Sequence, residues 1–281
     1  MSKQNGSSNG LDGKGTVVGG GTDLFVQKPE EMVHSDIRPL FDQPKLSEIF
    51  EKNGNCYIGA SVTAQELADS PLMQSLFPNL QSHMKLVSST PIRNMGTIAG
   101  NFVNASPIGD LTIFFLALDS QIVLNQKGKK RILPLKSFYK GYKQLDKAPD
   151  EIVEAISFKI PATEDYYNFE KVCKRTHLDI ASVNAACYLK LRENKIEEVH
   201  ISAGGVGPIP MYLSKGRETL IGEDINPEVV RKAARVIQAE IAPISDARGS
   251  AEYKRLLLRQ LFYAHFISFF PDKINLKDLI D

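Results

Sequence analysis

The chain has 281 residues, of which 42% are hydrophobic and 24% charged, and its formal net charge is +1. This composition is typical of a folded globular protein and excludes a wholly disordered chain. The near-neutral charge argues against a dedicated nucleic-acid-binding protein, and no apolar run reaches the roughly 18 residues of a membrane helix. The length is sufficient for two domains of ordinary size.

The three cysteines are far apart in the sequence and form no Cys-x-x-Cys pair. They cannot supply the four thiolates of an iron–sulfur cluster or a structural zinc site, and the five histidines show no metal-ligand spacing. We therefore predict no metal site. Unpaired thiols are typical of a reducing compartment, which predicts a cytoplasmic protein with free, buried thiols at Cys56, Cys173 and Cys187.

The first predicted element is a short strand at Val17 and Val18, followed at once by three consecutive glycines. Glycine opens the φ > 0 region, and several glycines in a row let successive backbone N–H groups point at one spot. Such a nest suits a phosphate or pyrophosphate, and Thr22 adds a hydroxyl donor. The spacing matches neither the P-loop nor the dinucleotide-binding fingerprint, so a permissive turn is the alternative interpretation. Residues 1–14, rich in Ser, Asn and Gly, are expected to be a disordered tail or a cloning remnant.

The next predicted elements are a short helix over residues 44–50 and a strand over residues 56–60. A second helix begins at Thr63, because Glu66 three residues later completes a capping box. This helix should end just before Pro71.

Residues 88–111 show no strong helical or strand period for over twenty residues. Small hydroxyl, amide and glycine residues dominate this segment, and interspersed apolar residues argue against disorder. Long irregular segments inside compact domains are usually functional, so we predict an ordered, donor-rich loop that contacts a large polar ligand. The alternative is an ordinary connection whose Asn and Ser side chains satisfy their own backbone.

A continuous apolar run over residues 111–118 predicts a buried helix with Asp110 near its N-terminus. Strands are predicted over residues 119–124 and 131–135, on either side of a basic turn, and another over residues 156–160. The polar segment 161–167 is the predicted domain boundary.

The second domain is predicted to begin with a strand over residues 169–175 and a hairpin that turns at residues 193–195. Two helices follow, one capped by Asn226 with Pro227 at its first position and one capped by Ser250. The glycine-rich segment 204–208 is interpreted as a structural turn, since the prolines that follow prevent a helix. The expected domains are residues 15–161 and 168–270, with residues 271–281 as a tail.

Two segments together resemble the flavin-binding loops of the FAD-binding subunit of molybdenum hydroxylases. This is the family of xanthine dehydrogenase, carbon monoxide dehydrogenase and 4-hydroxybenzoyl-CoA reductase. The first loop corresponds to residues 19–24 and the second to residues 92–94, 97–101 and 104–111. The likeness extends over about residues 15 to 265, with further matching segments at 138–142, 150–152, 169–172, 175, 179–181, 203–206 and 246–253.

Two features depart from the family pattern. Ala99 stands where the second loop usually has the first glycine of Thr-Ile-Gly-Gly. The family also usually has a strand and helix before the first loop, where this chain has only residues 1–14. Either the domain tolerates that loss, or the natural polypeptide is longer at its start.

The resemblance implies an α+β fold: a two-lobed FAD-binding domain of the flavin oxidase/dehydrogenase type, then a smaller α+β domain with an antiparallel sheet and helices. It implies one FAD, and the absence of His or Cys from both loops indicates that it is bound non-covalently. Lys171 would be a cation near the flavin, with a surface lysine at a strand end as the alternative. The predicted FAD-binding residues are Val17, Val18, Gly19, Gly20, Gly21, Thr22, Asp23, Leu24, Thr97, Ile98, Ala99, Gly100, Asn101, Ala105, Ser106, Asp110, Ile152, Val153 and Lys171.

The implied function is that of an electron-transfer subunit that accepts electrons from iron–sulfur clusters and passes them from FAD to NAD or another acceptor. Molybdopterin and the clusters would lie on partner subunits, and no catalytic side chain is needed because the flavin performs the chemistry. Two alternatives remain open: an FAD-poor scaffold subunit that serves assembly, and a self-contained flavin oxidase.

Overall fold

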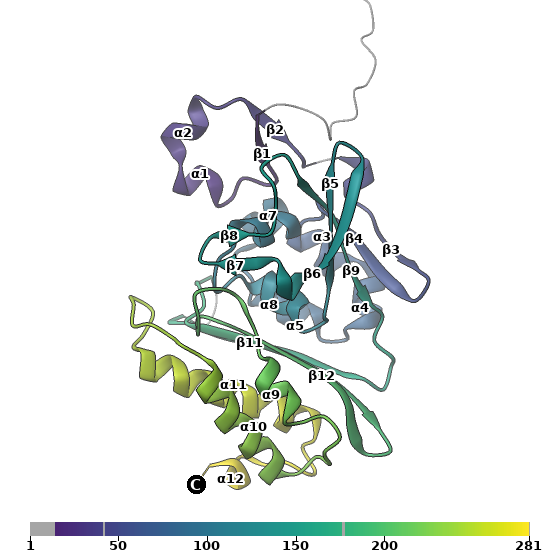
Figure 1. Ribbon diagram of the computed structural model, residues 1–281, viewed down its shortest axis with the longest axis vertical. Helices are drawn as coiled ribbons and strands as arrows, with labels where there is room; N and C mark the ends of the chain where they lie inside the picture. Colours follow the sequence, from purple (N-terminus) through teal and green to yellow (C-terminus); the bar gives the residue numbers. More distant parts are fainter. Residues whose placement is uncertain (1–14, 42, 176–177, 281) are drawn as a thin grey trace, which may run out of the picture.

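The computed structural model describes residues 15–41, 43–175 and 178–280, which form two lobes followed by a C-terminal domain (Figure 1). The expectation for residues 1–14 lies outside this range. Helices and antiparallel strands are mixed throughout, and the last sheet carries its own helices. The predicted α+β fold is confirmed.

The first lobe is small and consists of two short parallel strands joined by two short helices (Figure 1). Of the two valines predicted to form a buried strand, only Val18 is buried, since Val17 is 37% exposed. The glycine run directly follows the first strand. The elements of this lobe are β1 (Thr16–Val18), α1 (Leu24–Gln27), α2 (Pro29–Val33) and β2 (Ile37–Pro39).

The second lobe is built on a five-stranded antiparallel sheet with strand order β3-β4-β9-β5-β6. The helix predicted over residues 44–50 is wrong, because only a 3-10 turn forms before the chain enters β3. Asn53 and Gly54 adopt positive φ and turn β3 back onto β4, so Ile49 and Phe50 pair in a hairpin. The elements are η1 (Pro44–Leu46), β3 (Ile49–Lys52), β4 (Asn55–Gly59), β5 (Gln121–Gln126), β6 (Lys129–Pro134), η2 (Leu135–Ser137), the β7–β8 ribbon (Tyr139–Gly141 and Gln144–Leu145) and β9 (Ile152–Lys159).

Six short helices lie between β4 and β5, and the capping box of Thr63 and Glu66 that starts the first of them is confirmed. The prediction of an irregular segment over residues 88–111 is wrong, since two helices and the start of a third occupy it. Helices this short display too few turns for an apolar period to show in the sequence. They are α3 (Ala64–Asp69), α4 (Pro71–Leu76), α5 (Leu80–Lys85), α6 (Thr90–Met95), α7 (Ile98–Asn104) and α8 (Asp110–Leu116).

Helix α8 lies at the centre of the molecule, against the sheet of the C-terminal domain (Figure 1). Its residues after Asp110 are all buried, as the apolar run predicted. The Tyr167 hydroxyl donates to the carbonyl of Phe114 at 2.9 Å, and the Ser202 hydroxyl donates to that of Ile113 at 2.7 Å. These bonds attach the second lobe to the C-terminal sheet, so the position of Asp110 depends on both domains.

The C-terminal domain is a four-stranded antiparallel sheet covered on its outer face by helices. Strand β11 is buried on both faces: Ala186 and Tyr188 join the core of the first domain, whereas Ala185 and Cys187 pack under the helices. The predicted hairpin turn and the Asn226 and Ser250 caps are confirmed. The elements are β10 (Tyr166–Val172), β11 (Val183–Arg192), β12 (Lys195–Gly204), β13 (Met211–Tyr212), α9 (Ser214–Glu218), α10 (Pro227–Glu240), α11 (Ala251–Phe269) and α12 (Leu276–Leu279).

The segment expected as a C-terminal tail packs on this domain as far as it is described. Ile274 and Leu279 are 1% and 3% exposed and belong to the second hydrophobic core. The sequence pattern missed this because α12 has only four residues. No described helix is long and apolar enough to span a membrane.

Candidate flavin site

The two predicted loops meet each other in the structure. A Cβ atom built on Gly20 would lie 1.5 Å from the carbonyl oxygen of Met95, and one on Gly19 would lie 2.4 Å from the Thr97 hydroxyl oxygen. The sequence indicated that something must approach the glycine backbone closely. What approaches Gly19 and Gly20 is the second loop itself, so these glycines hold the two loops together.

The glycine loop also presents a row of unused donors. No backbone N–H from Gly20 to Leu24 donates a hydrogen bond to another described residue. Gly21 adopts a φ of +69°, the left-handed conformation that turns consecutive amides toward one side. The row ends at Asp23 and Leu24, where α1 begins. Such a set of free amides fits the pyrophosphate of FAD.

The N-terminus of α7 forms the second part of the site. The buried Thr97 caps this helix, since its hydroxyl accepts from the Gly100 N–H at 3.1 Å. Gly100 is exposed, whereas Ile98 and Ala99 are 0% and 9% exposed and join the hydrophobic core. The methyl group of Ala99 therefore packs inward, and the departure from the family pattern does not crowd the outer side of the loop.

The end of the second loop is held by polar contacts between α7 and α8. The Asn101 side-chain oxygen accepts from both the N–H and the hydroxyl of Thr112, at 3.0 and 2.9 Å. Ala105 ends α7 in a left-handed conformation, and the Ser106 hydroxyl accepts from the Ile108 N–H at 3.4 Å. Asn101 thus sets the angle between α7 and α8 and retains its NH₂ group for a ligand.

Asp110 and Lys171 form a buried ion pair between the two domains. The Lys171 Nζ lies 2.7 Å from Asp110 Oδ2 and 2.7 Å from the carbonyl oxygen of Leu86, and the lysine side chain is only 1% exposed. The alternative of a surface lysine is therefore wrong. Burial raises the pKa of Asp110, and the Lys171 ammonium and the Asn184 amide oppose that rise because they favour the carboxylate.

Asn184 is a site residue that the sequence did not reveal. Its NH₂ donates to Asp110 Oδ1 at 2.6 Å and to the Ile108 carbonyl at 3.2 Å. Asn184 is opposite Lys171 in the register of β10 and β11, so the two side chains reach the same carboxylate from neighbouring strands. The available signal was a single amide among the small and apolar residues 183–189.

Ile152 and Val153 lie apart from this cluster. Both are 3% exposed on β9, where Ile152 packs with Leu40 and Leu46 and Val153 belongs to the main core. Their contact with the flavin stays a prediction, and it requires access that the described packing does not provide.

The cysteines contribute no ligand cluster. Cys56 and Cys187 are fully buried, as expected, whereas Cys173 is partly exposed beside the ion pair of Arg175 and Asp179, whose Nε–Oδ2 distance is 3.3 Å. Among the described residues, no group of three or more His, Cys, Asp or Glu is arranged to hold a metal ion.

Comparison with known proteins agrees with this geometry. Residues 7–163 match the family model described as the FAD binding domain in molybdopterin dehydrogenase, and residues 168–269 match the CO dehydrogenase flavoprotein C-terminal domain. The chain belongs to this family. The predicted FAD-binding domain and the recognised family are confirmed.

The relatives include medium chains of two dehydrogenases. The chain is 30% identical over 226 residues to the carbon monoxide dehydrogenase medium chain of Afipia carboxidovorans, covering 80% of this chain and 76% of that one. It is 29% identical over 204 residues to the glyceraldehyde dehydrogenase medium chain of Sulfolobus acidocaldarius, covering 73% and 72%. The carbon monoxide dehydrogenase structure from Hydrogenophaga pseudoflava shares the fold, with a TM-score of 0.85, 23% identity and coverage of 91% and 89%. The chain is thus an FAD-binding oxidoreductase subunit of the molybdenum hydroxylase type.

Proposed function

We propose that this chain carries electrons through one non-covalently bound FAD. It takes them from iron–sulfur clusters on a partner subunit or domain and passes them to NAD or another acceptor. A second partner would hold the molybdenum cofactor and the reducing substrate. Similarity to a chain of a Cu,Mo-CO dehydrogenase, at 26% identity and a TM-score of 0.82, supports a molybdenum-containing partner.

The row of free amides from Gly20 to Leu24 is the observation that carries the proposal. An anionic pyrophosphate is held best by several preorganised donors, each charge-assisted bond contributing about 1.5–3 kcal/mol. Contact of the loop with Met95 and Thr97 prevents it from collapsing onto its own amides. The cradle is therefore formed before the ligand arrives.

The remaining residues orient the rest of the cofactor. Gly100 provides an open surface without a side chain, and Asn101 offers its free NH₂ group beside it. Asp110, held from two sides by Lys171 and Asn184, keeps its remaining lone pairs for hydroxyl or N–H donors. Bound FAD supplies the redox chemistry, while these residues position it and exclude water. Lys171 acts through Asp110 as a positioning residue.

The first experiment measures FAD uptake. The purified chain should bind one FAD per chain by fluorescence titration, and acid denaturation should release all of the flavin into the supernatant. Flavin that stays with the precipitate would contradict non-covalent binding. A folded chain that takes up no FAD would favour the scaffold alternative.

The second experiment identifies the electron acceptor of the reduced flavin. The FAD-loaded chain is photoreduced without oxygen and mixed with NAD, and then separately with a quinone and with oxygen. Reoxidation by one of these identifies the acceptor. Xanthine, aldehydes and carbon monoxide should leave the flavin of the isolated chain oxidised. Bleaching by any of them would support the self-contained oxidase instead.

A further inference from the structure

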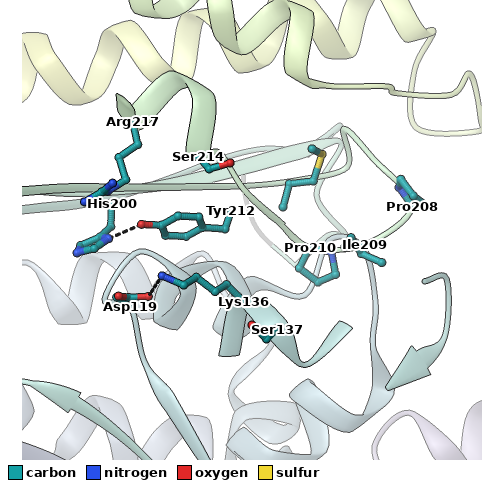
Figure 2. A pocket seen from close by; sticks show the side chains of 11 residues that line it. Asp119, Lys136, Ser137, His200, Pro208, Ile209, Pro210, Tyr212, Ser214 and Arg217 are labelled. Carbon is teal, nitrogen blue, oxygen red and sulfur yellow. Dashed lines mark hydrogen bonds and ion pairs between the residues drawn. The ribbon is translucent and has the colours of Figure 1, made fainter. Parts of the chain in front are cut away.

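A cavity of about 680 Å³ opens where the two domains meet (Figure 2), and none of its lining residues belongs to the candidate flavin site. Asp119, Lys136 and Ser137 line it from the first domain, and His200, Tyr212 and Arg217 line it from the C-terminal domain. Asp119 follows the C-terminal end of α8, whereas Asp110 begins that helix. The volume lies in the range of small-molecule sites, which are frequent at domain interfaces.

One wall of this cavity is apolar. Residues 208–211, Pro-Ile-Pro-Met, lead into and begin β13, and all four line the cavity. The two prolines have no backbone N–H, so this wall presents mainly carbon and sulfur atoms. Such a surface suits the flat body of an organic molecule.

Most polar groups of the cavity already have partners. The Tyr212 hydroxyl lies 2.5 Å from His200 Nδ1, and His200 Nε2 lies 2.9 Å from Glu198. A neutral imidazole satisfies both contacts, accepting from Tyr212 and donating to Glu198. Lys136 pairs with Asp119 at 2.9 Å, and its Nζ lies 4.8 Å from the centre of the Tyr212 ring.

Arg217 differs from these groups. Its Nε is buried and has no hydrogen-bond partner, and no carboxylate of the described residues lies within ion-pair distance of its guanidinium. Among the residues that line the cavity, Lys136 and Asp119 pair with each other, so Arg217 is left without a counter-ion in the cavity wall. The terminal nitrogens of Arg217 also have no acceptor among the described residues, and they are not buried, so an anionic ligand in the cavity can bond to them.

We propose that this cavity binds a small organic carboxylate with a flat apolar body. The carboxylate accepts from the two terminal nitrogens of Arg217, the two-pronged geometry that guanidinium and carboxylate share. The body packs against the 208–211 wall and the Tyr212 ring. The site is distinct from the flavin cradle, so binding is expected with and without FAD.

Isothermal titration calorimetry tests the proposal with 2-naphthoate and benzoate as probes and benzamide as an uncharged isostere of benzoate. Both carboxylates should bind one per chain, and benzamide at least about tenfold more weakly than benzoate. Arg217→Met should weaken naphthoate binding by at least about tenfold, whereas Lys232→Met, at an exposed lysine of α10, should change it less than about twofold.

A second variant tests the location without touching the arginine. Ser137 is exposed and lines the cavity, so Ser137→Trp should fill the space and abolish naphthoate binding while the fold persists by circular dichroism. The proposal is overturned if neither carboxylate binds, or if benzamide binds as well as benzoate. It is also overturned if Arg217→Met or Ser137→Trp binds naphthoate like the parent. Failure of FAD uptake would not affect these outcomes.

Discussion

Lys171 and Asp110 join the two domains at the first turn of α8, with 2.7 Å between Nζ and Oδ2. Lys171 comes from β10 of the C-terminal domain and also donates to the Leu86 carbonyl just beyond α5. One ammonium group thus holds a helix end, a carboxylate and a strand in one arrangement. The C-terminal domain thus contributes to the candidate flavin site through this contact.

Removal of the lysine charge should destabilise the fold. Lys171→Met leaves a buried carboxylate without its counter-ion, and we expect a loss of about 3 kcal/mol in the free energy of unfolding by urea titration. Lys28→Met removes the exposed pair with Glu31 and should cost less than about 1 kcal/mol. Asp110→Asn should lower the free energy of unfolding less in the Lys171→Met background than in the parent. Strictly additive losses would refute the coupling between Asp110 and Lys171.

The contact between the two loops leads to a prediction about Gly20. Gly20→Ala places a methyl group against the Met95 carbonyl, so the loops must separate, with an expected loss of about 1–3 kcal/mol in stability and weaker FAD binding. Gly141→Ala is the matched control, because the nearest atom to its added Cβ is Oε1 of the flexible Gln144 side chain, at 3.1 Å, and no backbone atom lies close. Equal FAD affinities in both variants, measured by fluorescence titration, would disprove the role of the loop contact.

Two buried histidines should make stability depend on pH. Asn168 bridges His83 and His265, at 3.3 and 3.1 Å, and burial lowers the pKa of His83 to about 4 and that of His265 to about 3, from 6.5. Below about pH 6.5 the unfolded chain binds protons that the native histidines do not, so stability falls as pH falls. The slope should approach about 1.4 kcal/mol per pH unit for each histidine.

Urea titrations between about pH 7 and pH 5 measure this slope. His83→Gln retains a side-chain donor for Asn168 but cannot titrate. It should therefore remove the contribution of one histidine from the slope, about 1.4 kcal/mol per pH unit. His34→Gln, at an exposed histidine, is the matched control variant. An unchanged slope in His83→Gln would show that the buried histidine is not responsible.

Thiol accessibility should distinguish the three cysteines. Cys56 and Cys187 are 0% exposed, and burial raises the pKa of both thiols, that of Cys56 to about 12. Cys173 is partly exposed. A thiol reagent should therefore label one cysteine in the native chain, none in Cys173→Ser, and all three of the parent in urea. Rapid labelling of a second native thiol would contradict the described packing.

Local sequence determined the elements whose signals lie within a few residues. The caps at Thr63, Asn226 and Ser250 each depend on one side chain and an amide three residues later, and all three form as predicted. The buried helix over α8 followed from its continuous apolar run, because nothing but burial stabilises such a run. The two candidate flavin loops were recognisable because their glycine, amide and hydroxyl residues match the two loops of the family in type and order.

Only the tertiary structure decided which groups meet. Residues 88–111 read as irregular, yet they form α6, α7 and the start of α8, since packing stabilises helices too short to persist alone. Gly20 faces Met95, and Asn184 reaches Asp110, through contacts that span 74 residues or more in the sequence. No local pattern encodes such contacts, because they arise from the order of strands and the angle between domains. The sequence by itself therefore determined the cofactor class, and the folded chain determined how the site is held.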